Sequence, residues 1–294
     1  MRIIKKIIND KNKIIIYRKK NKILVDKIFQ KKNLFFYKKE ISGINYFKKK
    51  KYFDIPKVYS FRLRDNLGKI TLEYIDGKKP SSFNFNKIFK SDIRVNKKLD
   101  FDEYLNNLIK NYKIKKNFCL KNYNNFKKKI SVSMTHGDLV NYNCLEKNKK
   151  FYIFDFEKFR ERITVFDYFN WLLHPLSFNV SKYFILNNRN ILIKIFNNLI
   201  LMSVNIFIKI LIKRIFFKLK INFKDFELYY FLFLYEKIFI IENDLHYVKN
   251  KNVKYNAQKH IGFLKFICQN LLRVINKNYN KNLFLALKTC TCKL

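Results

Sequence analysis

A short stretch near the middle of the sequence constrains the fold more than any other: MTHGDLVNYNCLEKNKKFYIFDFEKF, residues 134–159. It contains two short apolar arms around a Lys/Asn turn, which is the pattern of a β-hairpin. Asn143 lies just before the first arm and Asp155 just after the second, so pairing of the arms would bring these two side chains together. Asp138 would lie beside them. The stretch therefore predicts a polar site built on a hairpin.

The residue types at this site indicate a particular chemistry. Carboxylate and amide oxygens suit Mg²⁺, which takes one or two protein carboxylates and completes its shell with water and phosphate oxygens. If Asn143 and Asp155 hold such a metal, Asp138 is a carboxylate held off the metal that can receive a hydroxyl proton. These are the parts that phosphoryl transfer requires.

The segments HGDLVNYN and IFDFE, in this order, resemble the catalytic loop and metal-binding segment of the aminoglycoside phosphotransferase and choline kinase-like enzymes. The spacing H-x-D-x-x-x-x-N is also that of the protein-kinase signature. The resemblance runs through most of the chain and is most specific at residues 136–157. It implies a small-molecule kinase that uses ATP and Mg²⁺ and has the two-lobed protein-kinase-like fold.

The resemblance also implies a role for each of the polar side chains. Asp138 corresponds to the base that orients and deprotonates the acceptor hydroxyl, and Asn143 and Asp155 correspond to the metal ligands. His136 corresponds to a residue that braces the loop, a role close to that of an ordinary buried histidine. Asp167, in VFDYFNW, corresponds to another loop-bracing residue, and a simple helix N-cap is an equal alternative for it.

Residues 1–77 have the pattern of a small antiparallel β lobe with one helix. Three runs rich in β-branched residues predict strands, namely RIIKKII, KIIIYRK and KILVDKIF. Two further strands are expected in DIPKVYSFRL and GKITLEYIDG, with a turn at Gly68 between them. Residues 34–50 place Phe36, Glu40, Ile44 and Phe47 at steps of three and four, which predicts a helix.

The resemblance assigns nucleotide binding to this lobe. Lys27 corresponds to the strand lysine that holds the α- and β-phosphates, and Glu40 corresponds to its ion-pair partner on the helix. Backbone groups from about Glu73 to Ile75 correspond to the hinge that hydrogen-bonds the adenine. The turn NDKNK between the first two strands contains no Gly, so the usual Gly-rich phosphate loop is missing, and the choice between ATP and GTP stays open.

Two features and the absence of a following A-P-E motif argue against a protein substrate. Gly137 stands where regulated protein kinases carry an Arg before the catalytic Asp. Only eleven residues separate Asp155 from Asp167, too few for a long activation segment. Glu157 replaces the Gly of the protein-kinase DFG motif, as in the small-molecule branch. Its side chain either approaches a second metal or forms a salt bridge with a surface lysine.

Residues 78–294 are expected to form a larger, mainly helical lobe, which makes the fold class α+β. KKPSSFNFNK is typical of a connector, FDEYLNNLIKNYKI and NFCLKNYNNFKKKI are expected to be helical, and most of the chain after Asp167 has broad apolar helical faces. No membrane span or secretory signal is expected. Five scattered Cys indicate a reducing compartment, so the expected location is the cytoplasm.

The acceptor is less clearly encoded than the chemistry. A net charge of +41, with only 22 acidic residues, favours a neutral or anionic acceptor, such as a sugar of a cell-envelope glycan. The alternatives are a choline, ethanolamine or aminoglycoside kinase, or a non-catalytic kinase-like module that binds anionic partners. The presence of Asp138, Asn143 and Asp155 together counts against a non-catalytic module.

The positive charge is expected to be a solvated surface, with no specific nucleic-acid partner. Among 63 Lys and Arg only ten are Arg, and Lys is spread along the whole chain. Its excess accompanies that of Asn, Ile, Phe and Tyr, whose codons are also AT-rich. Direct readout of bases relies on Arg, which is rare here. Any contact with the inner face of an anionic membrane should likewise be weak and electrostatic.

We therefore expect DNA, RNA and anionic vesicles to bind weakly and without sequence preference. Most of this binding should be lost between about 50 and about 200 mM salt, because it depends on counterion release. Titration of labelled nucleic acids and vesicles at several salt concentrations measures this. Tight binding of one defined nucleic-acid sequence at physiological salt would contradict the expectation.

Overall fold

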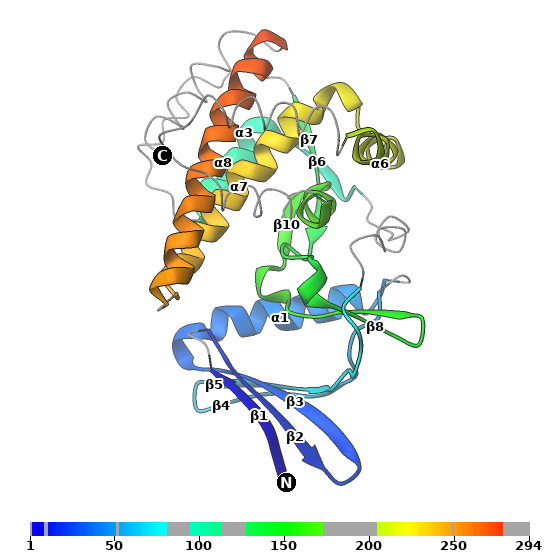
Figure 1. Cartoon of the computed structure of the whole chain (residues 1–294), viewed down its shortest axis with the longest axis vertical. Helices are drawn as coiled ribbons and strands as arrows, with labels where there is room; N and C mark the ends of the chain where they lie inside the picture. Colours follow the sequence, from blue (N-terminus) through cyan, green and yellow to red (C-terminus); the bar gives the residue numbers. More distant parts are fainter. Residues whose placement is uncertain are drawn as a thin grey trace. The chain divides into compact units, whose positions relative to one another are not determined.

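The structure is a computed structural model, and contacts within it divide the chain into two compact units. The first unit consists of Met1–Ile93 and Met134–Arg162, and the second of Arg94–Ser133 and Ile163–Leu294. The structure describes residues 2–8, 11–50, 53–80, 95–112, 128–172, 205–248 and 250–278. Each unit is considered by itself below (Figure 1).

The first unit is built on a five-stranded antiparallel sheet with the order β1-β2-β3-β5-β4. Its strands are β1 (Arg2–Ile8), β2 (Lys13–Lys19), β3 (Lys22–Phe29), β4 (Val58–Arg64) and β5 (Leu67–Glu73). All five strands predicted for this region are therefore present. Short turns join β2 to β3 and β4 to β5, whereas between β3 and β4 the chain leaves the sheet to form a helix.

That helix, α1 (Leu34–Phe47), follows a short 3-10 turn, η1 (Lys31–Asn33), and lies across one face of the sheet (Figure 1). Its buried side includes Tyr37, Ile44 and Phe47, as the predicted periodicity requires. Glu40 is also on this side and is only 1% exposed. A buried carboxylate needs a partner, so its position already indicates a buried cation nearby.

The turn between β4 and β5 lies earlier than the sequence suggested. Asp65 and Asn66 form it, with φ of 48° and 60°, whereas Gly68 lies inside β5. Asp and Asn tolerate the left-handed conformation that a tight hairpin needs, so no Gly is required in the turn. Gly68 instead leaves room for the ring of Tyr37, which would lie 2.7 Å from a Cβ at that position.

The predicted hairpin of residues 144–157 is present as β8 (Cys144–Lys147) and β9 (Lys150–Ile153). Backbone hydrogen bonds join it to the N-terminal part of the chain, with Glu146 N donating to Lys78 O (2.8 Å) and Asp54 N donating to Phe151 O (2.9 Å). The compact first unit therefore includes residues 134–162. The predicted division after residue 77 had placed this segment with the C-terminal region, because pairing between distant segments is not visible in the sequence.

The second unit contains the helices α3 (Phe101–Tyr112), α6 (Asn205–Lys218), α7 (Phe226–Leu245) and α8 (Lys251–Asn278), and residues 166–172 are also helical. A three-stranded sheet has the order β10-β7-β6, formed by β6 (Lys97–Asp100), β7 (Lys129–Thr135) and β10 (Arg160–Ile163). β6 and most of β7 belong to the second unit, whereas most of β10 belongs to the first. The helix expected over residues 117–130 is wrong at its end, because residues 129 and 130 belong to β7. The rest of that stretch up to residue 127 lies outside the described residues, as does most of the expected connector.

The core of the second unit is centred on α7, in which all residues from Leu228 to Ile240 are buried. α8 packs along α7 (Figure 1). Glu236 on α7 is buried and accepts hydrogen bonds from Tyr104 Oη (2.9 Å) and Tyr112 Oη (3.0 Å) of α3. Among the described helices, none combines the length and the apolar character that crossing a membrane would require.

Gly43 of α1 allows very close packing within the first unit. It faces the one-turn 3-10 helix η3 (Phe156–Lys158), and a Cβ at Gly43 would lie 2.8 Å from Cγ of Phe156. Gly costs about 1 kcal/mol relative to Ala inside a helix. Here that cost permits α1 and η3 to approach each other.

We predict that Gly43→Ala lowers the free energy of unfolding by about 1–3 kcal/mol, because the added methyl overpacks the contact with Phe156. Ser42→Ala is the matched control, since Ser42 is exposed on the same helix and its replacement should change stability little. Thermal or urea unfolding of both variants measures the difference. If Gly43→Ala were the more stable protein, helix propensity would outweigh the packing.

Candidate active site

The hairpin brings Asn143 and Asp155 together as its pattern predicts. Cys144 pairs with Ile153 in the β8–β9 ladder, and Phe154 N donates to the backbone oxygen of Asn143 at 3.2 Å. Asn143 ends a short 3-10 turn, η2 (Asn141–Asn143), and Asp155 comes directly after Phe154. Backbone pairing alone therefore fixes the relative positions of these two predicted metal ligands.

Asp155 has a backbone conformation that is unusual for its residue type. Its φ and ψ are 70° and 63°, in the left-handed region, which costs a non-glycine residue about 1–2 kcal/mol. This conformation ends β9 and begins η3 in a single residue. Its side chain remains 39% exposed, whereas the side chains of Phe156 and Glu157 that follow are buried.

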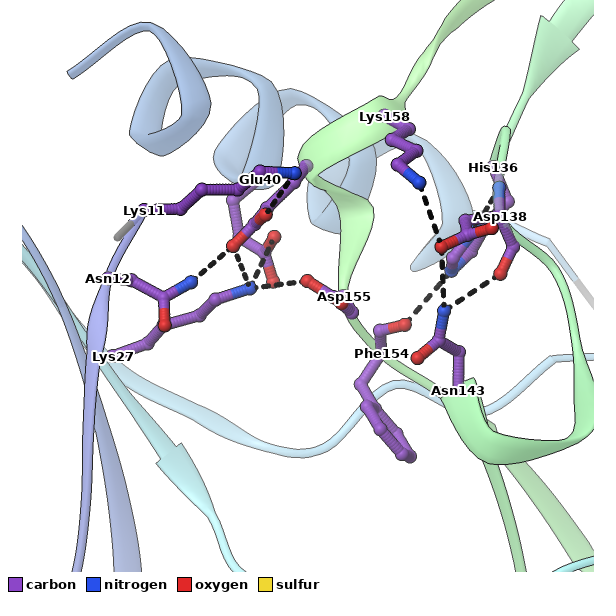
Figure 2. A network of polar contacts seen from close by, with 11 residues as sticks. Lys11, Asn12, Lys27, Glu40, His136, Asp138, Asn143, Phe154, Asp155 and Lys158 are labelled. Atoms are coloured by element: carbon purple, nitrogen blue, oxygen red, sulfur yellow. Dashed lines mark hydrogen bonds and ion pairs between the residues drawn. The ribbon is translucent and has the colours of Figure 1, made fainter. Parts of the chain in front are cut away.

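Lys27 of β3 is the centre of a buried charged cluster, which Figure 2 shows in close view. Its Nζ lies 3.1 Å from Glu40 Oε2, 2.6 Å from Asp155 Oδ1 and 3.0 Å from Glu157 Oε1. The predicted ion pair of Lys27 with Glu40 is therefore confirmed. Three segments distant in the sequence meet at one ammonium group.

Burial and the neighbouring charges shift the pKa values of Glu40, Asp155 and Lys27 in different ways. Burial raises the pKa of Glu40 to about 8, against the effect of Lys27 and with help from the two other carboxylates. Burial also acts to raise the pKa of Asp155, but the ammonium of Lys27 prevails and lowers it. Burial would lower the pKa of Lys27, yet its three carboxylates hold it well above its ordinary value. Asp155 is thus ionised near neutral pH.

Glu157 is tied to the turn between β1 and β2. Its carboxylate lies 3.9 Å from Lys11 Nζ and accepts a hydrogen bond from the side-chain amide of Asn12, which is buried. Of the two interpretations left open for Glu157, an ion pair is present, but with the buried Lys27 rather than with a surface lysine alone. Lys11 and Asn12 carried no signal in the sequence beyond their place in the glycine-free stretch NDKNK.

Asp138 is held by two side chains that approach it from opposite sides (Figure 2). Asn143 Nδ2 donates to the backbone oxygen of Asp138 at 2.8 Å and reaches its Oδ2 at 3.5 Å. Lys158 Nζ lies 3.2 Å from the same Oδ2. Because the amide nitrogen of Asn143 is directed at Asp138, its amide oxygen points away and is suited to ligate a cation.

His136 lies beneath this loop, fully buried. Its Nε2 lies 2.9 Å from Phe154 O, and its Nδ1 accepts from Asp138 N at 3.3 Å. Both bonds are satisfied when the proton is on Nε2. The ring also packs against Phe156, at 4.8 Å between ring centroids. His136 therefore links the loop that carries Asp138 to the segment that carries Asp155, and the bracing role expected for it stays a prediction.

Arg162 provides a second brace that the sequence did not reveal. Its guanidinium is buried and donates to Thr135 Oγ1 (3.0 Å) and to the backbone oxygen of Lys158 (2.7 Å). Gly137, with φ of 81°, packs against both Arg162 and Lys158, and a Cβ there would lie 2.7 Å from Arg162 Cζ. The position that carries Arg in regulated protein kinases thus requires Gly here, for reasons of both space and backbone conformation.

The remaining predicted residues lie at the edge of the site or in the other unit. Glu73 ends β5, and its backbone N–H donates to Lys57 O (2.8 Å), while Tyr74 N donates to Ile23 O (3.3 Å). The predicted adenine contact therefore depends on the amide of Ile75 and on carbonyl groups. Asp167 is buried in the first turn of the helical stretch 166–172 of the second unit. Its bracing role stays a prediction.

The donor set fits a divalent cation at Asn143 and Asp155. An amide oxygen and an ionised, partly exposed carboxylate are suitable ligands for Mg²⁺, and the exposed side leaves room for water and phosphate oxygens. Glu40, Asp155 and Glu157 also lie close enough to share a metal ion, with ligand atoms within 4.8 Å of one another. Lys27 already bridges these three carboxylates, so the Asn143 side of Asp155 fits a cation better.

We predict that Glu40 makes the free energy of unfolding depend on pH. Its pKa is higher in the folded protein than the ordinary value of 4.5, so its contribution to stability is present at low pH and lost as the pH rises towards 8. Between pH 5 and 8 the wild type should lose up to a few kcal/mol relative to Glu40→Gln, at about 1.4 kcal/mol per pKa unit. Denaturant unfolding across this range measures it, and parallel curves for the two proteins would contradict it.

Comparison with known proteins shows similarity in structure rather than in sequence. The sequence matches no protein-family model, and no curated protein is significantly similar to it. Among solved structures, a candidate fructosamine-3-kinase from Haemophilus somnus 129PT superimposes with a TM-score of 0.51 at 13% identity. The match covers 88% of this chain and 90% of that one.

Two further structures superimpose less well. A choline kinase from Streptococcus pneumoniae has a TM-score of 0.49 at 14% identity, with 90% of this chain and 94% of that chain covered. A candidate aminoglycoside phosphotransferase from Ralstonia eutropha jmp134 has a TM-score of 0.48 at 10% identity, with 89% and 92% covered. The match to the Haemophilus somnus protein covers most of both chains and confirms the expected α+β, protein-kinase-like fold.

Proposed function

We propose that the protein is a phosphotransferase that uses ATP and Mg²⁺ to phosphorylate a hydroxyl group of a small molecule. The observation that carries this proposal is the geometry around Asp155. The ionised carboxylate of Asp155 contacts the buried Lys27, and backbone pairing places Asn143, whose amide oxygen can ligate a metal, close to it. A second carboxylate, Asp138, is held nearby by Asn143 and Lys158. Metal ligands, a phosphate-binding cation and a base are the components of phosphoryl transfer.

Each residue has a defined task in this proposal. Asp155 and the amide oxygen of Asn143 would hold the divalent cation, which would neutralise phosphate charge. Lys27 binds the phosphates, and Glu40 keeps its ammonium in place. Asp138 accepts the proton of the acceptor hydroxyl as the new bond from oxygen to phosphorus forms and the bond to the departing nucleoside diphosphate breaks. The bracing by His136 keeps Asp138 and Asp155 in register.

For the acceptor we propose a neutral or anionic molecule, such as a sugar of a cell-envelope glycan. The reason is charge, because a cationic substrate would approach a protein of net charge +41 against its field. The name of the Haemophilus somnus protein points to fructosamine as a substrate of that protein. A panel of sugars, glycan fragments, sugar amines, choline, ethanolamine and aminoglycosides, incubated with ATP and Mg²⁺, tests the proposal when the phosphorylated product is detected by mass. No phosphorylation of any acceptor and no ATP turnover would favour a non-catalytic binding module.

Substitution of Asp138 and substitution of Asp155 should impair the enzyme in different ways. Asp138→Asn should reduce turnover by ~10²-fold or more while nucleotide binding persists, because it removes a base but no metal ligand. Asp155→Asn should weaken Mg²⁺-dependent nucleotide binding as well. Initial rates and calorimetric titration with a non-hydrolysable ATP analogue separate the two effects.

Asp65→Asn is the matched control for these variants. It makes the same chemical change at an exposed turn residue whose left-handed conformation Asn tolerates equally well. It should retain wild-type rates and binding. An Asp138→Asn variant with the wild-type rate would show that Asp138 is not the base.

A further inference from the structure

Lys158 is a charged residue of the site to which the motif assigns no task. It is the last residue of η3, and its Nζ lies 3.2 Å from Oδ2 of Asp138. Its side chain is 19% exposed and that of Asp138 is 14% exposed, so the pair is largely shielded from water. Charge-assisted contacts of this kind are stronger than those on an open surface.

The backbone of Lys158 is fixed rather than loosely tethered. Its carbonyl oxygen accepts a hydrogen bond from the buried Arg162 at 2.7 Å, and Gly137 packs against the same carbonyl. Phe156, two residues earlier, is buried against α1 at Gly43. The lysine therefore projects from an anchored turn, and the fold itself directs its ammonium towards Asp138.

The distances place this ammonium next to the reacting atoms. An acceptor hydroxyl must lie within about 2.6–3.2 Å of the carboxylate that takes its proton. The phosphorus that it attacks must lie about 3–3.5 Å from the hydroxyl oxygen in a reactive complex. A cation in contact with the Asp138 carboxylate is thus within a few ångströms of the transferring group, a span that the flexible lysine side chain covers.

The charge of the site creates a need for such a cation. Phosphoryl transfer spreads negative charge over the equatorial oxygens of the moving group, and fixed cations aimed at it are among the largest contributions to catalysis. The turn between β1 and β2 has no glycine to present several backbone N–H groups to phosphate. Lys27 is already engaged by three carboxylates, and no residue of the motif supplies a second cation.

We propose that Lys158 is a catalytic residue of this phosphotransferase: it orients the Asp138 carboxylate in the resting site and stabilises the phosphoryl group during transfer. The inference rests on the proposed function. Lys158 exchanges no proton in this step, since Asp138 takes the proton of the hydroxyl. Its contribution is therefore a positive charge at a fixed place, which can be tested by keeping or removing that charge.

The experiment compares Lys158→Gln, which keeps a hydrogen-bond donor but loses the charge, with Lys158→Arg, which keeps the charge. The full-length protein is assayed with ATP and Mg²⁺ for transfer to the acceptor found in the panel, and for ATP hydrolysis. We expect Lys158→Gln to lower kcat by ~10²-fold with KM for ATP changed less than about threefold. The kcat of Lys158→Arg should be at least tenfold higher than that of Lys158→Gln. Lys5→Met, at an exposed position of β1, is the control for loss of one positive charge and should match the wild type.

The outcomes separate the two proposals. A wild type that turns over ATP, together with a Lys158→Gln variant within threefold of its kcat, overturns the role of Lys158 and leaves the proposed function intact. An equal loss in Lys158→Gln and Lys158→Arg, at unchanged melting temperature, also overturns it, because the charge would not matter. A raised KM for ATP with unchanged kcat would make Lys158 a ground-state binding residue and contradict the proposal. A wild type without ATP turnover contradicts the proposed function itself, and the role of Lys158 falls with it.

Discussion

The first unit depends on one buried ammonium group. Lys27 joins β3 to α1 through Glu40 and to the segment after β9 through Asp155 and Glu157. Without it, three carboxylates would face one another with no cation between them, and an uncompensated buried charge costs about 3–5 kcal/mol. The contact that positions the candidate phosphate-binding lysine thus also holds the unit together, so stability and function are linked at the same atom.

The sequence predicted those parts of the fold that depend on local pattern. Alternating β-branched residues located the strands of the N-terminal sheet, and steps of three and four located α1. It missed β6, β7 and β10, which pair with one another across long stretches of the chain. It also misplaced the turn before β5, because Gly68 looked like a turn residue when its actual task is to make room for Tyr37. Such errors arise where a contact distant in the sequence decides what a residue does.

Residues of the candidate site were easier to predict when their residue type is rare in this chain. The chain has 22 acidic residues against 63 Lys and Arg, so Asp138 and Asp155 at fixed spacing stand out, whereas any single lysine does not. Lys27 could be selected because the helix that follows β3 offers Glu40 as its partner. Lys11 and Lys158 have no comparable signal, and only the folded arrangement shows that both point to carboxylates of the site. Arg162 likewise gains its meaning only from the backbone oxygen that it binds.

The short turn from Asp155 to Lys158 explains why so much depends on packing around it. Asp155 turns the chain through its left-handed conformation, and the three residues that follow then point to three different partners. Phe156 packs on α1, Glu157 meets the β1–β2 turn and Lys27, and Lys158 reaches Asp138. Glycine is needed on both sides, at Gly43 against Phe156 and at Gly137 against Lys158, in a chain with only five glycines. A turn this crowded cannot shift without moving Asp155, Lys158 and Asp138 together, so close packing enforces the geometry of the candidate site.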